Sequence, residues 1–427
     1  MRPFNLAATT GTLLLLAACA DRETMLLTAP PRNAPSRSVT SETSSESWQS
    51  IVTGETGPGS MYALYMPRAW NGTVVYYAHG IRNILLEPEV SLRDQDGYQA
   101  VRDALGARGY AFAYSSFDDN GYAEKDGAQR THQLRGLFTS RFGAPQRSLL
   151  VGHSLGGLVA LDLGERFSNQ YDGVAAFCSV AGGTQAELDH MVNTRLLFDL
   201  YYPGVLEGAF NQIPPGYNID PSRDPATLAR IQAAINANPL GLLVIANTEQ
   251  AGIEFVPAPA FTLKTMVQSV VTALVFHAAG YDNLLTLTNG KFPFDNSQTS
   301  YRAVANVVVP PPLNTFIPPQ AITAQIAGID ARAPLSTGDP SALQYAAKYF
   351  TPSGALKIPT LTLHNRFDPL VPYWHETMFA ERVSNAGALD RLQQRVNPGY
   401  GHCSFSTDEQ VKAITDLAQW VETGVKP

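Results

Sequence analysis

The segment RSLLVGHSLGGLVALDLG, residues 147–164, constrains the fold more than any other part of the chain. An apolar run passes directly into Gly-His-Ser-Leu-Gly-Gly, and a second apolar run follows. This order is typical of a buried strand that turns sharply into a helix. Gly152 and Gly156 stand two positions before and after Ser154, where a Cβ atom would clash with the tightly turning backbone. We therefore expect Ser154 to project above the end of a strand; an ordinary glycine-rich turn is the alternative.

From Ile51 onwards the chain alternates β-rich segments with helical ones. Such alternation predicts an α/β fold with a mostly parallel central sheet and helices on both of its faces. The expected strands are 61–66, 73–78, 110–115, 148–151, 172–180, 358–364 and 391–396. Helices are expected at 97–108, 131–142 and 158–167, so that residues 51–427 form the globular part.

The first 18 residues have the features of a secretory signal peptide: Arg2, an apolar run ending in four leucines, and then two alanines. The sequence Leu-Ala-Ala-Cys resembles the bacterial lipobox, in which cleavage precedes a cysteine that becomes lipidated, here Cys19. Ordinary signal-peptidase cleavage near Ala18 or Ala20 is the alternative. Residues 19–50 are too polar to fold and are expected to be a disordered tether. We thus expect a protein of the bacterial cell envelope, lipid-anchored in the outer membrane or else secreted.

A serine hydroxyl needs a general base and an orienting acid to act as a nucleophile. Asp368 follows the apolar segment IPTLTLH, and His402 follows RLQQRV. The chain order Ser154, Asp368, His402 and the loop positions fit this requirement. The alternatives are a turn-capping role for Asp368 and a surface-loop position for His402.

Acyl transfer also requires hydrogen-bond donors for a developing oxyanion. One expected donor is the backbone N–H of Leu155. The second is that of Ile81, with Arg82 as the next choice, since both follow the strand VVYYA and the pair His79-Gly80. A plain strand-ending turn explains His79-Gly80 equally well. No cysteine and histidine residues have zinc-site spacing, so neither a metal nor another cofactor is expected.

Together the motifs AHG, GHSLGG, RFDPLVP and YGHCSF resemble the α/β-hydrolase superfamily, with a layout similar to secreted bacterial esterases and lipases. The resemblance covers about residues 51–183 and 358–427, and it implies an α/β-hydrolase fold with a Ser154, His402 and Asp368 triad. The pair His402-Cys403 is also similar to tannases and feruloyl esterases, whose cysteine after the histidine is bridged to one just before the serine. In this chain that preceding position is His153.

Residues 184–357 form an insertion where this fold often carries a cap. Helices are expected at 187–202, 225–237, 262–279, 319–329 and 341–350. A cap would enclose an apolar pocket over Ser154. Each aromatic residue of its loops is better explained as part of the cap's own core, although some must face the pocket: Tyr201, Tyr202, Phe255, Phe261, Phe276, Tyr281, Phe292, Phe294 and Phe316.

The formal net charge of −7 and the absence of a basic run argue against a nucleic-acid partner. The expected function is a serine carboxyl-ester hydrolase that acts on an apolar small-molecule or polymeric ester. Alternatives are a polyester depolymerase, a non-catalytic binding lipoprotein and a capped serine aminopeptidase. The aminopeptidase would need a carboxylate to hold a free amine, for which Glu187, Asp189 and Asp199 are candidates.

Two further cysteines, Cys178 and Cys403, remain if Cys19 carries lipid. Cys178 ends a predicted strand beside the strand of Ser154, and Cys403 follows His402, so both are expected at the same sheet edge. The sequence leaves open whether they form a disulfide or two neighbouring thiols.

Replacing Cys19 tests the anchor. We expect Cys19→Ser to turn a membrane-associated protein into an unprocessed or soluble one, because the anchor is the acylated sulfur. Fractionation of cells that produce either form measures the change. Wild-type mature protein found entirely in the soluble periplasmic fraction would contradict the lipoprotein interpretation.

Overall fold

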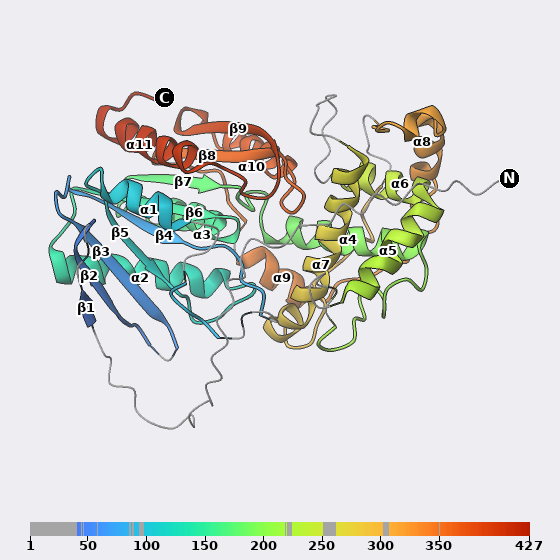
Figure 1. Ribbon diagram of the computed structural model, residues 1–427, viewed down its shortest axis with the longest axis horizontal. Coiled ribbons are helices and arrows are strands. Elements are labelled where there is room, and N and C mark those ends of the chain that lie inside the picture. The colour runs from blue at the N-terminus through green and yellow to red at the C-terminus, as the bar shows by residue number, and fades with distance from the viewer. Residues whose placement is uncertain are drawn as a thin grey trace, which may run out of the picture.

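The computed structural model describes residues 41–427 apart from 44, 46, 58, 85, 86, 88, 94–97, 218, 220–223, 251–261, 302–306 and 350. The expected signal peptide, Cys19 and the first part of the expected tether lie outside the described residues. Figure 1 shows a sheet covered by helices beside a helical body that joins it along one end.

The sheet has nine strands among the described residues, in the order β1-β2-β3-β5-β4-β6-β7-β8-β9. The six strands from β5 to β9 in this order pair in parallel, and β1, β2 and β3 are antiparallel. The predicted, mostly parallel sheet is thus confirmed. The strands are β1 (Ser41–Thr43), β2 (Trp48–Glu55), β3 (Met61–Pro67), β4 (Thr73–Ala78), β5 (Ala111–Ser115), β6 (Arg147–His153), β7 (Gly173–Phe177), β8 (Thr360–Phe367) and β9 (Leu392–Tyr400).

Helices cover both faces of the sheet, because side chains of successive strand residues point to opposite faces. In β4, Val74 and Tyr76 pack into the apolar layer under α2, α3 and α10. Val75 and Tyr77 pack into the layer under α1 and α11. The covering helices are α1 (Tyr98–Gly106), α2 (Glu124–Phe142), α3 (Leu155–Arg166), α10 (Trp374–Asn385) and α11 (Thr407–Thr423).

The globular part begins earlier than expected, because the described residues between 41 and 50 do not continue the tether. They contain β1 and the start of β2, which pair with each other and with β3. The reason is Trp48, whose side chain is 2% exposed and contacts the ring of Tyr65. Its indole N–H donates to Asp103 Oδ1 at 3.1 Å. One large buried side chain thus fixes a segment whose composition is otherwise polar.

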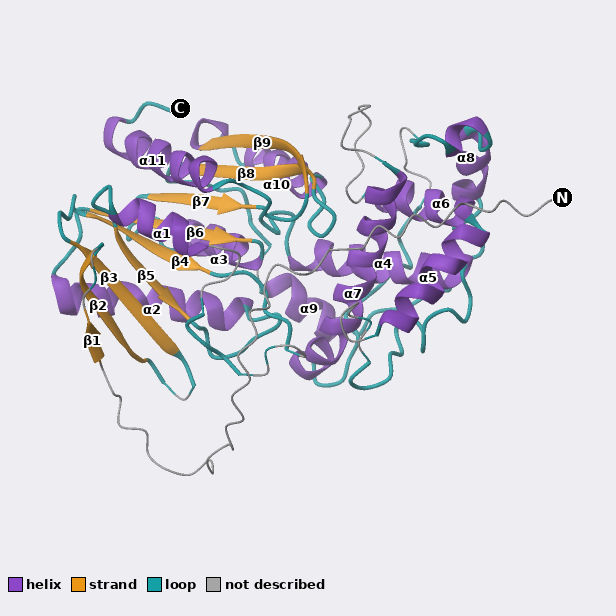
Figure 2. Ribbon diagram, viewed as in Figure 1, coloured by secondary structure: helices purple, strands orange, loops and turns teal. Residues whose placement is uncertain are grey.

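The insertion forms the helical body in Figure 2, with a separate apolar core. Its central helix α7 is long and apolar enough to cross a membrane, as the bent pair of α5 and α6 would be together. Half of the most apolar window of α7 is buried inside the molecule, as in the core helix of a soluble protein. The cap elements are α4 (Thr184–Tyr201), α5 (Pro225–Ala237), α6 (Pro239–Glu249), α7 (Leu263–Leu287), η1 (Leu313–Thr315), α8 (Pro319–Ala327) and α9 (Pro340–Lys348).

Several helices differ from the sequence-based prediction: α10 and α11 were not among the expected helices, α7 continues to Leu287 instead of ending at 279, and α2 and α6 differ for identifiable reasons. Helix α2 begins at Glu124 rather than near Thr131, because its first turn is acidic and polar and gives no amphipathic signal. Helix α6 was not predicted. Its residues 241–247 are all buried, so the helix is apolar on every side and lacks the 3.6-residue period that reveals a surface helix.

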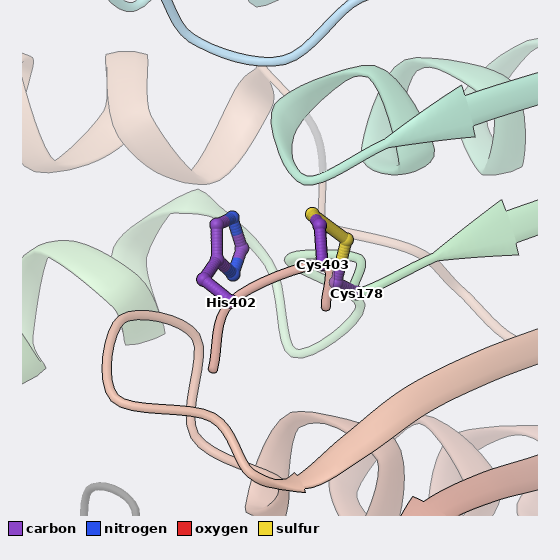
Figure 3. A group of neighbouring side chains, drawn as sticks. All are labelled: Cys178, His402 and Cys403. Carbon is purple, nitrogen blue, oxygen red and sulfur yellow. A yellow bond between two sulfur atoms is a disulfide. The ribbon is translucent and has the colours of Figure 1, made fainter. Parts of the chain in front are cut away.

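Cys178 and Cys403 form a disulfide with Cα atoms 5.3 Å apart. Cys178 directly follows β7, and Cys403 lies in the loop between β9 and α11. Figure 3 shows the ring of His402 beside the two bonded sulfurs. The bridge therefore ties the His402 loop to the end of a central strand.

Removing this bridge tests its structural role. The double variant Cys178→Ser, Cys403→Ser is expected to lose about 2–5 kcal/mol of unfolding free energy, because the cross-link restricts the unfolded chain. Chemical denaturation measures the loss, and reduced wild-type protein is the matched control, which should show a similar loss. Alkylation of the denatured, unreduced protein followed by mass spectrometry should leave both cysteines unlabelled; two labelled thiols would contradict the bridge.

Candidate active site

Ser154 stands on the sharp turn between β6 and α3, with φ 52° and ψ −121°. A Cβ at Gly152 would lie 2.0 Å from Gly156 O, and one at Gly156 would lie 2.1 Å from Ala78 O. The expected reason for these two glycines is therefore confirmed. The turn presses against the end of β4, so the Ser154 backbone is held in a conformation that L residues rarely adopt.

Asp368 follows β8 and is completely buried. Its Oδ1 accepts hydrogen bonds from the backbone N–H groups of Leu370 and Val371, at 2.9 and 3.0 Å. Its Oδ2 lies 2.8 Å from Nδ1 of His402, which donates to the carboxylate. Asp368 thus caps its turn, as the structural alternative required, and also orients the imidazole. That orientation leaves Nε2 of His402 as the free ring nitrogen.

His364 lies next to the same carboxylate and bonds to the turn that follows it. Its Nε2 donates to Val371 O at 2.8 Å and lies 3.6 Å from Asp368 Oδ2. Burial disfavours the cation, but the nearby carboxylates of Glu376 and Asp368 outweigh it and raise the pKa of His364. His364 is completely buried, and its role is to hold the turn that presents Asp368.

The two expected oxyanion donors border the same pocket as Ser154: Ile81 lies in the loop after β4, and Leu155 is the first residue of α3. A Cβ on Gly80 would lie 3.3 Å from the Ser154 Cβ, so this loop passes directly against the serine. No hydrogen bond within the described residues uses the amide of Ile81 or of Leu155. Arg82, the next choice, points its guanidinium to the carbonyl groups of Ser91 and Arg93.

His79 fixes the peptide that carries the Ile81 amide. Its Nδ1 donates to Gly80 O at 2.7 Å, and its ring stacks on Phe117. Burial, and then the charge of Arg82, lower the pKa of His79 to about 3, so the ring is neutral at neutral pH. In a planar trans peptide the C=O and the following N–H point in opposite directions. The hydrogen bond to Gly80 O therefore turns the Ile81 N–H away from His79.

Ser154 borders a pocket between the sheet and the cap. The insertion contributes lining residues from α4 and α7. Most of the lining is apolar: Ile81, Leu155, Val180, Met191, Phe276, Leu370 and Val371. The polar residues in the lining, besides Ser154, are Tyr122, Glu124, Thr184 and Glu187.

Two carboxyl groups are thus buried beside the serine. Burial, and then the negative charge of Asp368, hold the pKa of Glu187 well above its usual range. Burial raises the pKa of Glu124 to about 7, although its own backbone amide and Thr184 favour the charged form. Glu187 was an expected pocket carboxylate. Glu124 was missed, because nothing in the sequence of the acidic segment 118–126 distinguishes it from the other acidic residues there.

The other two proposed pocket carboxylates lie elsewhere. Asp189 accepts a hydrogen bond from Gln185, at 2.7 Å, and Asp199 pairs with Arg195 at 2.8 Å. Neither lines the pocket.

Of the cap aromatics, only Phe276 lines the pocket among the described residues. Tyr202, Tyr281, Phe292 and Phe294 pack within the cap. Tyr201 packs against the same core, Phe316 is exposed, and Phe255 and Phe261 lie outside the described residues. The interpretation that each of these rings serves the cap core thus holds for most of them.

The remaining histidines have structural contacts. His153 pairs through Nε2 with Gln410 Oε1 at 2.7 Å, and His277 donates to Phe210 O at 3.0 Å. Potential metal-ligand atoms of Cys178, His402 and Cys403 lie within 4.8 Å of one another. The two sulfurs are bonded to each other, so they cannot bind a metal as thiolates.

Comparison with known proteins gives distant similarities. No model of a protein family matches the sequence. An o-phthalyl amidase of Xanthobacter agilis is 23% identical over 414 residues, covering 88% of each chain. Among solved structures, feruloyl esterase B of Aspergillus oryzae is 15% identical, with TM-score 0.46, over 88% of this chain and 81% of that one. Candida antarctica lipase A is 11% identical, with TM-score 0.43, over 91% and 82%.

The architecture itself defines the fold. The strand order with its parallel run, the serine on a sharp turn after β6, and the acid and histidine after β8 and β9 occur together in one chain. A helical cap is inserted after β7, above the same sheet edge. This chain has the α/β-hydrolase fold.

Proposed function

We propose that this protein is a serine hydrolase of carboxylic esters, with amides as a second class of substrate. Ser154 Oγ attacks the carbonyl carbon while His402 Nε2 takes the hydroxyl proton. The carbonyl oxygen becomes an oxyanion that accepts hydrogen bonds from the amides of Leu155 and Ile81. His402 then protonates the leaving group, and water hydrolyses the acyl-enzyme by the same steps.

One observation carries this proposal: the hydrogen bond from His402 Nδ1 to the fully buried Asp368. A buried carboxylate whose other oxygen is occupied by two backbone amides can accept only at Oδ2. It therefore selects the tautomer and the ring orientation that a general base requires. A surface-loop histidine with no catalytic role would not need a buried carboxylate to fix its ring.

The pocket supports an apolar substrate, since most of its lining residues are apolar. The amidase similarity makes amides worth testing beside esters. A polyester depolymerase would bind its polymer at an open surface, whereas Ser154 lies beneath the cap. The positions of Cys19 and the signal-like residues further support the proposal that the enzyme works in the bacterial cell envelope, on a lipid anchor.

Removal of the nucleophile tests the reaction. Ser154→Ala is expected to lower turnover of a p-nitrophenyl ester by a factor of about 10³ or more, because only the oxyanion donors and binding then remain. Ser179→Ala is the matched control, since Ser179 is also buried but does not line the pocket. Undiminished turnover in the Ser154 variant would show that the turn is structural. Hydrolysis of aminoacyl-anilides but not of simple esters would favour the aminopeptidase alternative.

The role given to His79 has its own test. His79→Leu removes the donor to Gly80 O and is expected to lower kcat by about 10- to 100-fold with little change in KM. The reason is that a misoriented Ile81 amide weakens only the hydrogen bond to the oxyanion, which is absent from the bound substrate. His79→Asn keeps a donor near Nδ1 and should recover most of kcat. Equal losses in both variants, shared between kcat and KM, would indicate a packing role instead.

A further inference from the structure

Glu124 and Glu187 have no function in the proposed reaction, yet both carboxyl groups are buried in the pocket of the nucleophile. They come from different parts of the fold: Glu124 begins α2 of the sheet domain, and Glu187 lies on α4 of the cap. Glu187 is 4% exposed and Glu124 is 3% exposed. A buried carboxyl group without a matching partner destabilises a fold, so its presence calls for a ligand that completes it.

The surroundings of Glu187 do not satisfy the hydrogen-bonding capacity of its carboxyl group. Its Oε1 has no hydrogen-bond partner among the described residues. His375 Nε2 lies 2.9 Å from Oε2, but out of line for a hydrogen bond. Nδ1 of His375 accepts from the Gly182 N–H at 2.9 Å, and burial holds the pKa of His375 well below its usual range, so the ring carries no charge. Glu187 therefore has no cationic partner.

No positively charged side chain in the described part of the pocket lining balances the two acids. None of the described residues that line it is a lysine, arginine or histidine. Tyr122, which lines it too, donates its hydroxyl to Met191 Sδ at 3.4 Å rather than to a carboxylate. Burial, and then the charges of Glu187 and Glu124, raise the pKa of Tyr122, which lines the pocket together with both acids.

The ring of Phe276 completes the lining on the cap side. Aromatic rings and carboxylates both attract an organic cation, and the aromatic contribution grows where water is excluded. An anion would meet two acids and no positive side chain. A neutral alkyl group would leave Oε1 of Glu187 without a partner.

We propose that the pocket binds a substituted ammonium group carried by the substrate, held between Glu124 and Glu187 and against Tyr122 and Phe276. This inference rests on the proposed hydrolase function and specifies its substrate class: esters or amides with a positively charged nitrogen in the acyl or the alcohol part. The sheet domain and the cap each supply one acid, so the site exists only when the cap lies over Ser154.

The test compares isosteric esters that differ only in charge. In the acyl pair, p-nitrophenyl 4-(trimethylammonio)butanoate is matched by p-nitrophenyl 5,5-dimethylhexanoate, whose quaternary carbon replaces the nitrogen. In the alcohol pair, choline butanoate is matched by 3,3-dimethylbutyl butanoate. We expect the ratio of kcat/KM for the cationic ester over its neutral partner to exceed ten in at least one pair.

Variants then test whether the two acids cause the preference for the cationic ester. Glu187→Gln and Glu124→Gln should each lower that ratio at least fivefold, whereas Asp189→Asn should leave it unchanged. Asp189 is the matched control because it lies on the same helix and does not line the pocket. If a variant fails to fold, inhibition of the wild-type enzyme by butyltrimethylammonium is compared with that by 2,2-dimethylhexane, its neutral isostere, and only the cation should compete with substrate.

The outcomes separate the two proposals. Ester or amide turnover that depends on Ser154, with charge ratios of one or less in both pairs, would overturn the ammonium site alone. A preference for substrates with a carboxylate would do the same, since it would require both acids to act as neutral donors. Absence of any turnover dependent on Ser154 would instead overturn the hydrolase function.

Discussion

The close approach of two backbone segments underlies the whole site. A Cβ atom at Gly156 would clash with Ala78 O at the end of β4, and one at Gly152 would clash with Gly156 O within the turn from β6 into α3. This contact places Ser154 at a positive φ, a conformation that costs about 1–3 kcal/mol in a non-glycine residue. The surrounding parallel strands offset the cost. Because the β4 loop lies against the serine, it also brings the Ile81 amide to the same pocket.

The histidine side of the site depends on two further restraints from different strands. The turn after β8 occupies one oxygen of Asp368 with backbone amides and directs the other to His402. The disulfide holds the residue next to His402 at the end of β7. These restraints act on neighbouring loops, so His402 is positioned by the sheet rather than by its own exposed loop. A fixed imidazole is what general-base chemistry requires, since misplacement by an ångström lowers rates strongly.

Much of this arrangement could be predicted from local sequence signals. The glycines around Ser154, the loop that holds Asp368 and the chain order to His402 each express a short-range constraint, and together they indicate the fold. Long-range packing was not predictable in the same way. The buried side chain of Trp48 anchors a segment of polar composition that forms β1 and the start of β2. Helix α6 is buried on all sides, so its sequence shows no helical period. Glu124 lies in a run of acidic residues, and only its place beneath the cap sets it apart from them.

The cap gives the site its chemical character. Its helices α4 and α7 line the pocket of Ser154, whose side chain is buried there. In these surroundings burial, and then the negative charge of Asp368, raise the pKa of Glu187, and burial raises the pKa of Glu124. The same enclosure that strengthens oxyanion stabilisation thus makes these two buried acids significant for substrate choice.

The central claim is that Ser154 is a nucleophile activated by His402. Labelling with a fluorophosphonate, which reacts covalently with activated serines, tests it most directly. After digestion and mass spectrometry, the adduct should map to Ser154 in the wild-type protein, and His402→Ala should lose the label while keeping its fold by circular dichroism. An unlabelled Ser154 in folded wild-type protein, or equal labelling in the His402 variant, would contradict the account.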